Sequence, residues 1–185
     1  NGFGDLKETA SKIKVIKESW LAEWHDSLNS NEEPISYYRV IQEINKNLDL
    51  ENSIVTHDAG APRDTIVPFF SATIPHSYIG WGKTTHLGFG IPLMIGAKMA
   101  QPEKFCLNLM GDGAFGMSGT DLETAVRSGA AITTVLLNNS AMATYSGPLQ
   151  GTIGEEARNR YGVSSMQGDY AKIAEGMGAI GIKVS

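Results

Sequence analysis

Residues 110–147 read MGDGAFGMSGTDLETAVRSGAAITTVLLNNSAMATYSG and are the most informative stretch of the chain. An aspartate stands between two glycines at its start. An amphipathic segment and the apolar run AITTVLL follow, and the run ends on Asn138 and Asn139. An apolar run of this length is typical of a buried strand. Because the carboxyl end of a strand is where open parallel sheets bind ligands, the polar residues there predict a site.

Segments on either side of this stretch extend the same alternation. We predict further strands at 53–57 and 104–110, a turn at 58–64, a buried helix at 90–101 and another helix at 118–128. Strands that alternate with helices favour a parallel sheet. Near-continuous apolar strands favour helices on both faces of that sheet. The predicted fold class is therefore α/β, a parallel β-sheet with helices on both faces, in a single-domain fragment.

The two ends of the chain predict its organisation. Residues 5–28 have apolar side chains at helical spacing, so we assign residues 1–30 to a linker helix that enters a domain at 31–185. The last residues predict a helix, a turn and the start of a strand. An α/β domain does not usually end there, so we expect the C-terminal part of the domain to be missing.

Composition excludes several classes of partner. The formal net charge of the 185 residues is −5 and no basic run is present, which argues against nucleic acid. No apolar stretch reaches the roughly 18 residues that a membrane-spanning helix needs. The one cysteine, Cys106, cannot form a disulfide within the chain and fits a reducing compartment. We predict a cytoplasmic protein without a membrane partner.

Asp112 and Asn139 follow neighbouring predicted strands, so both should lie at the same edge of the sheet. Gly111 and Gly113 allow a sharp turn and a close approach of the backbone to a ligand. One carboxylate together with neutral oxygens suits Mg²⁺, which usually completes its coordination with phosphate oxygens and water. The residues alone therefore predict a magnesium and phosphate site.

The spacing of these motifs resembles a known family. GDG, then the 24 residues 114–137, then NN resembles the signature of enzymes that use thiamine diphosphate. The stretch THLGFGIPLMIGAKMAQPEKFCLNLMGDGAF, residues 85–115, is more specifically similar to the pyruvate decarboxylase and acetolactate synthase superfamily. The resemblance is strong over residues 77–139. It implies that residues 31–185 form the diphosphate-binding domain.

The resemblance implies an activity. Enzymes of this family act on 2-keto acids or similar acyl donors, and cleave and form C–C bonds through the ylide of the thiazolium ring. We expect an acetolactate-synthase-like carboligase or decarboxylase, a lyase or transferase. A 2-hydroxyacyl-CoA lyase and a benzoylformate-type decarboxylase remain alternatives. Flavin, in the form of FAD, is used by some relatives and is not indicated by this sequence.

Residue roles also follow from the resemblance. The metal ligands would be the side chains of Asp112 and Asn139 and the carbonyl of Ala141. Leu87 would be the apolar wedge that bends the cofactor, and the backbone of Thr85 would accept a hydrogen bond from its amino group. The expected cofactor-binding residues are Gly60, Ala61, Thr85, His86, Leu87, Gly111, Gly113, Ala114, Asn139, Ala143 and Thr144.

The family's catalytic glutamate would have to come from elsewhere. It belongs to a separate pyrimidine-binding domain of the same or a neighbouring subunit, and no such domain is recognisable here. We assign the role to neither Glu123 nor Glu155. The expectation is a homodimer or homotetramer with sites between subunits, in which this chain alone is inactive.

Two rival interpretations belong to other classes. The first is a non-catalytic nucleotide- or metal-binding regulatory module on the same scaffold. The absence of G-x-x-x-x-G-K-[ST] and of a clear G-x-G-x-x-G argues against it. The second is a family member that has lost its cofactor, and the presence of both Asp112 and Asn139 argues against that.

Overall fold

The computed structural model describes residues 5–82, 84, 86–141, 155–162 and 166–184. Three parallel strands form one sheet in the order β1-β2-β3. They are β1 (Ser53–His57), β2 (Phe105–Gly111) and β3 (Ile132–Leu137). Register pairs Ser53 with Phe105 at one end and Gly111 with Leu137 at the other. The predicted strands are confirmed, each within one residue.

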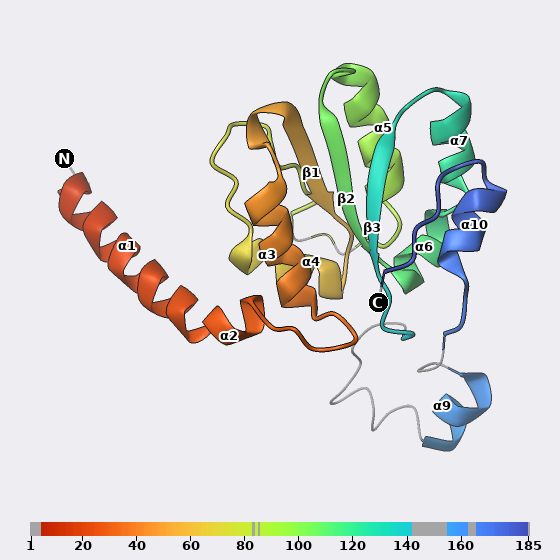
Figure 1. The fold of residues 1–185 in the computed structure, drawn as a ribbon, viewed down its shortest axis with the longest axis horizontal. Coiled ribbons are helices and arrows are strands. Elements are labelled where there is room, and N and C mark those ends of the chain that lie inside the picture. Colours follow the sequence, from red (N-terminus) through yellow and green to blue (C-terminus); the bar gives the residue numbers. More distant parts are fainter. Residues whose placement is uncertain (1–4, 83, 85, 142–154, 163–165, 185) are drawn as a thin grey trace.

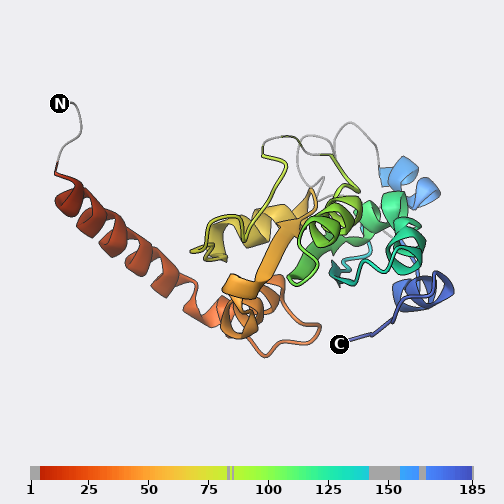
Figure 2. The same cartoon turned by 90° about the horizontal axis from the view of Figure 1, so that it is seen from above.

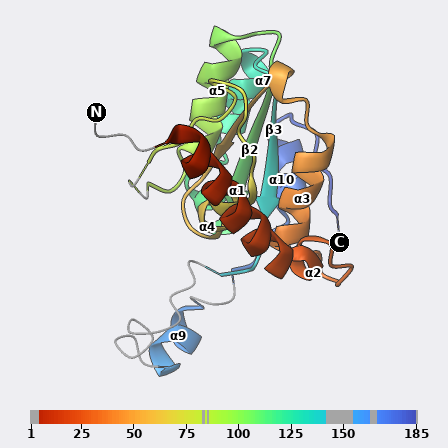
Figure 3. The ribbon, with the colours of Figure 1, turned by 90° about the vertical axis from the view of Figure 1, so that its left-hand side faces the viewer.

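Helices cover both faces of this sheet, as the sequence predicted. Figure 3 shows α3 and α5 on opposite sides of the strands. The first face carries α3 (Tyr37–Asn47) and α4 (Ala61–Phe69), and the second carries α5 (Gly90–Ala100), α6 (Asp112–Ser118) and α7 (Asp121–Arg127) (Figure 1). A last helix, α10 (Tyr170–Gly176), packs beside α6 through Tyr170 and Phe115, whose rings meet edge to face 5.6 Å apart.

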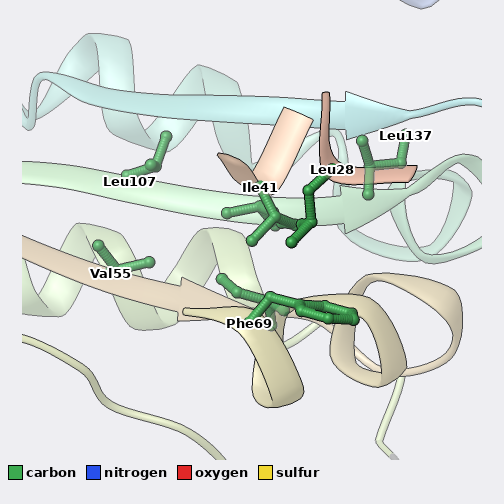
Figure 4. Packing of buried hydrophobic residues seen from close by; sticks show 8 residues of the cluster. Leu28, Ile41, Val55, Phe69, Leu107 and Leu137 are labelled. Carbon is green, nitrogen blue, oxygen red and sulfur yellow. The ribbon is translucent and has the colours of Figure 1, made fainter. Parts of the chain in front are cut away.

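Alternate residues of β2 divide the core into two halves. Leu107 and Leu109 face α3 and α4, where they join Ile41, Val55 and other buried side chains (Figure 4). The intervening residues of β2 face α5, and Cys106 packs there against Met94 while Met110 joins a cluster with α6. Because successive side chains of a strand point to opposite faces, one apolar run serves both halves.

The N-terminal helix extends away from the sheet (Figures 1 and 2). α1 (Leu6–Glu23) is capped by Asp5, whose carboxylate accepts hydrogen bonds from two backbone N–H groups of the first turn. Only its end joins the core, where Trp20 stacks on Phe69 with ring centroids 4.9 Å apart. The helix predicted over 5–28 is interrupted at Trp24, after which α2 (His25–Leu28) begins.

Three predicted elements need correction. The segment predicted as a turn, 58–64, begins helix α4 at Ala61, and Pro62 fits its first turn because the N–H that proline lacks would have no helical partner there. The helix predicted at 118–128 is the shorter α7, and a helix that was not predicted, α6, begins at Asp112, directly after β2. No strand follows α10 within residues 177–184.

The remaining elements are short. A 3-10 turn, η1 (Leu50–Asn52), precedes β1, and α9 (Glu155–Tyr161) lies below the sheet in Figure 1. Within the described residues, no helix combines the length and hydrophobicity needed to cross a membrane.

Candidate functional site at the carboxyl edge of the sheet

The carboxyl ends of the three strands lie along one edge of the sheet. Asp58 follows β1, Asp112 follows β2 and Asn138 follows β3. The backbone N–H of Asp58 donates to the carbonyl of Leu109, 2.6 Å away, which ties the end of β1 to β2. Gly111 of β2 and Leu137 of β3 are the last paired residues of these two strands. Asp112 and Asn138 directly follow that pair. The register thus brings the GDG and NN motifs to neighbouring strand ends.

Asp112 is a buried carboxylate with one free oxygen. The residue is only 2% exposed. Its Oδ1 accepts a hydrogen bond of 2.9 Å from the N–H of Gly113. Oδ2 is buried and has no partner among the described residues. A buried carboxylate oxygen without a partner costs free energy unless a donor or a cation reaches it. The donor set therefore fits a divalent cation.

The charge of Asp112 influences two nearby phenols. Burial raises the pKa of Tyr37, and the negative charge of Asp112 raises it further. The same two causes, in the same order, raise the pKa of Tyr170. The Tyr37 hydroxyl is buried and has no hydrogen-bond partner among the described residues.

Asn139 differs from Asp112 in its surroundings. It is exposed, and its Oδ1 accepts a hydrogen bond of 3.0 Å from the N–H of Ala141. Asn138 makes the same kind of turn, with its Oδ1 3.0 Å from the N–H of Ser140. A carboxamide oxygen has two lone pairs, so this turn leaves Asn139 capable of one further contact. Ala141, the third expected ligand, is partly buried beside it.

The segment after β1 lies against the GDG turn. Gly60 has φ +83° and is the N-cap of α4, and Ala61 is the first residue of the helix. A Cβ on Gly111 would lie 3.8 Å from the ring of Pro62. No atom lies within 4 Å of the position that a Cβ of Gly60 would take, so the space at that position is open. The structure therefore places two of the predicted cofactor-binding segments beside each other.

Leu87 packs against the hydrophobic cluster to which α6 contributes. It is partly buried, and the cluster contains Ala114 and Phe115, which follow the GDG motif. His86, next to it, is exposed. The structure thus brings the expected wedge residue to the helix that begins with Asp112. Three of the predicted site residues lie outside the described residues: Thr85, Ala143 and Thr144.

Sequence reasoning missed two buried polar residues, Asp58 and Asn108. Asp58 is 0% exposed and accepts hydrogen bonds from the N–H groups of Gly88 and Gly90. Asn108 lies in the middle of β2, is 0% exposed, and its carboxamide has no partner among the described residues. Both positions carried a signal. An aspartate directly after a strand repeats the arrangement of Asp112, and an asparagine interrupts the apolar run CLNLM.

A hollow of about 580 Å³ opens beside the end of β1 and the start of α4, lined by His57, Arg63, Tyr78 and neighbouring residues. Of the described residues predicted to hold cofactor or metal, none lines it. Nor do three or more His, Cys, Asp or Glu side chains gather as a metal site in the described part of the chain. Among the described residues, the candidate site is therefore an edge at which Asp112 has the one buried carboxylate oxygen without a partner.

Known proteins resemble this chain in sequence and fold. A family model described as "Thiamine pyrophosphate enzyme, C-terminal TPP binding domain" matches residues 58–185. The mitochondrial acetolactate synthase catalytic subunit of Saccharomyces cerevisiae is 29% identical over 97% of this chain and 28% of its own length. The acetolactate synthase isozyme 3 large subunit of Escherichia coli is 29% identical over 91% of this chain and 29% of its own length.

A solved structure shares the fold. A thiamine diphosphate-dependent 4-hydroxybenzoylformate decarboxylase of Rhodococcus jostii superposes with a TM-score of 0.63 and 23% identity, over 80% of this chain and 27% of that one. The chain spans less than a third of the length of these relatives.

Proposed function

This chain belongs to the thiamine pyrophosphate enzymes and matches their C-terminal cofactor-binding domain, and from that premise we propose that its sheet edge holds thiamine diphosphate through Mg²⁺. The observation that carries the proposal is the buried Oδ2 of Asp112, which has no partner among the described residues. Asn139 and the carbonyl of Ala141 would complete the protein ligands, and diphosphate oxygens and water the rest.

The other residues of the edge would position the cofactor. Gly60, Ala61, Gly111, Gly113 and Ala114 would bring backbone close to the diphosphate, since small residues admit a close approach. Gly113 already donates its N–H to Asp112, so its main contribution would be space for the diphosphate.

Leu87 would support the bent cofactor from below. His86 would face its outer side, and Thr85, Ala143 and Thr144 would make the contacts that the resemblance implies. The bound cofactor supplies a nucleophilic carbon and an electron sink for reactions next to a carbonyl carbon.

We propose that the whole enzyme is acetolactate-synthase-like and acts on 2-keto acids, as a carboligase or decarboxylase. The curated relatives that carry this name support the proposal. The catalytic glutamate would come from a pyrimidine-binding domain, in a homodimer or homotetramer whose subunits share sites.

Calorimetry tests the cofactor site. In the intact protein, thiamine diphosphate should bind with Mg²⁺ and should lose at least about a hundredfold in affinity when EDTA replaces the metal. Asp112→Ala should lose the metal-dependent part of the affinity, whereas the exposed Asp64→Asn should keep it. Binding that is equally tight with and without metal, or an Asp112→Ala protein with full affinity, would show that the ligand assignment is wrong.

A panel of substrates tests the reaction class. Pyruvate, 2-ketobutyrate and benzoylformate, each with product identification, distinguish carboligation from simple decarboxylation. Benzoylformate is included because the structural neighbour is named as a decarboxylase of a hydroxylated benzoylformate, although its 23% identity shows the fold alone. A 2-hydroxyacyl-CoA should be cleaved only by the lyase alternative. Cofactor binding without turnover of any of these would favour a regulatory module.

A further inference from the structure

The turn at Leu87–Gly90 is held by one buried carboxylate from a distant part of the chain. Asp58 accepts from the N–H of Gly88 through Oδ1, at 3.0 Å, and from the N–H of Gly90 through Oδ2, at 2.9 Å. Oδ1 also accepts from the N–H of Ala59 at 2.8 Å. Both carboxylate oxygens are therefore committed to backbone, and Asp58 is completely buried.

The turn is also confined from two other sides. Gly88 has φ +91°, and a Cβ there would lie 3.3 Å from side-chain atoms of Met117 and Ser118 at the end of α6. A Cβ on Gly90 would lie 2.3 Å from Oδ1 of Asn108 in β2. The turn thus fits between the end of β1, the middle of β2 and the helix that begins with Asp112. Small shifts of its backbone would meet one of these neighbours.

Leu87 is the residue that this arrangement places. It stands directly before Gly88 and packs in the cluster that contains Ala114 and Phe115 of α6. Asp58 holds Gly88 and Gly90 by hydrogen bonds and therefore fixes the position of Leu87 relative to α6. Asp58 lies 29 positions before Leu87 in the chain. The same carboxylate would not coordinate the metal, because its oxygens are occupied by the three backbone N–H groups.

We propose that Asp58 is a positioning residue that fixes Leu87 relative to α6 and thereby sets the bend of the bound cofactor. The inference rests on the proposed function, because it assigns Leu87 a contact with thiamine diphosphate. It separates two tasks at one edge: Asp112 anchors the cofactor, and Asp58 sets its conformation. A variant of Asp58 should therefore bind cofactor and yet activate it poorly.

Asp58→Asn is the informative substitution, with Asp49→Asn as its matched control. The asparagine keeps the size of the side chain but has only one acceptor oxygen. Its NH₂ group, a donor, would face the N–H of Gly88 or of Gly90, which is also a donor. Asp49 is exposed and also accepts a backbone N–H, that of Glu51 at 3.1 Å, but it lies before β1 and does not contact the turn. The chemical change is the same at both positions.

The first readout is amide hydrogen exchange of the intact protein without cofactor. Asp58→Asn should speed exchange at Gly88 and Gly90 by roughly tenfold or more, because charge-assisted hydrogen bonds are lost. Asp49→Asn should leave these two amides at the wild-type rate. Unchanged protection of both glycines in Asp58→Asn would overturn the role of the carboxylate in holding the turn.

The second readout is the exchange rate of the C2 proton of bound thiamine diphosphate, followed by NMR after acid quench. Asp58→Asn should bind the cofactor within about threefold of the wild-type affinity but exchange this proton roughly tenfold to a hundredfold more slowly, since catalytic geometry tolerates little displacement. Activity should then fall in kcat with little change in KM. Wild-type exchange in a variant with a loosened turn would overturn the proposal.

Gly88→Ala keeps the test decisive if Asp58→Asn does not fold. It displaces the same turn from the side of α6 while Asp58 stays intact, so it should slow C2 exchange by a similar factor. Full C2 exchange in Gly88→Ala would overturn the proposal. If wild-type protein does not bind thiamine diphosphate, the proposed function fails together with the cofactor part of this inference, whereas the amide exchange result still decides whether Asp58 holds the turn.

Discussion

The end of β2 and the end of β3 carry the two halves of one sequence motif in opposite physical states. Asp112 is 2% exposed, and one of its oxygens has no partner in the described part of the structure. Asn139 is exposed and its carbonyl oxygen already accepts a backbone N–H. The β2 side of the edge is therefore built at a cost in stability, while the β3 side costs almost nothing.

Buried polar groups concentrate on the β1 and β2 side of the edge. Asp58, Asn108 and Asp112 are all buried, and the last two have polar atoms without a partner among the described residues. Such groups are tolerated where function requires them, at a cost in stability. Changes on the β2 side should therefore alter stability, whereas changes on the β3 side should mostly alter ligand affinity.

The largest effect is expected from Gly90→Ala. Its Cβ would collide with Oδ1 of Asn108, 2.3 Å away, so the free energy of unfolding should fall by about 3 kcal/mol. Adding Asn108→Ala should return about 2 kcal/mol, because the neighbour that blocks the methyl group is then gone. Urea unfolding of the wild type, both single variants and the double variant forms the cycle. Strictly additive effects would show that the two residues are not packed as described.

A smaller effect of opposite sign is expected from Asp112→Ala in the protein without cofactor. Removing a buried oxygen that lacks a partner should raise the free energy of unfolding by about 1 kcal/mol. Asn139→Ala, at an exposed site, should change it by at most about 0.5 kcal/mol.

Saturating Mg²⁺ and thiamine diphosphate should reverse the order and make the wild type more stable than Asp112→Ala. Thermal unfolding with and without both ligands provides the measurement. A loss of stability in ligand-free Asp112→Ala would mean that the hydrogen bond from Gly113 to Oδ1 outweighs the cost of the buried Oδ2.

The smallest effect is expected at Tyr37. Burial first, and the charge of Asp112 second, raise its pKa, so Asp112→Ala should lower that pKa without returning it to the usual value. Mg²⁺ bound at Asp112 should act in the same direction. Ultraviolet titration of tyrosinate, with Tyr37→Phe to assign the signal, measures the shift.

The sign of the linked stability follows from the raised pKa. The contribution of Tyr37 to stability is fully present below the usual pKa of a tyrosine, 10.0, and is lost as the pH rises through the higher folded value. The loss should still begin near the usual value in Asp112→Ala, but it should end at a lower pH and be smaller in total, because the folded pKa lies closer to the unfolded one. A total alkaline loss of stability that Asp112→Ala leaves unchanged would show that the carboxylate charge does not reach the phenol.

Sequence patterns predicted the strands well and the helix boundaries less well. The apolar runs of β1, β2 and β3 were located because burial on both faces leaves a continuous local pattern. The start of α6 at Asp112 was missed because its first residues, GDGAFG, have the composition of a turn, and packing against β2 and β3 overrides that preference. The same applies to α4, which begins in GAPRD.

Local periodicity and strand direction were enough to predict the parallel sheet, its covered faces and the meeting of GDG and NN at one edge. Which polar groups are buried depends on tertiary contacts. Asp58 meets Gly88 and Gly90 across 30 and 32 positions, and Asn108 fills the space beneath Gly90. Such contacts join segments that are remote in sequence, so no local sequence pattern predicts them.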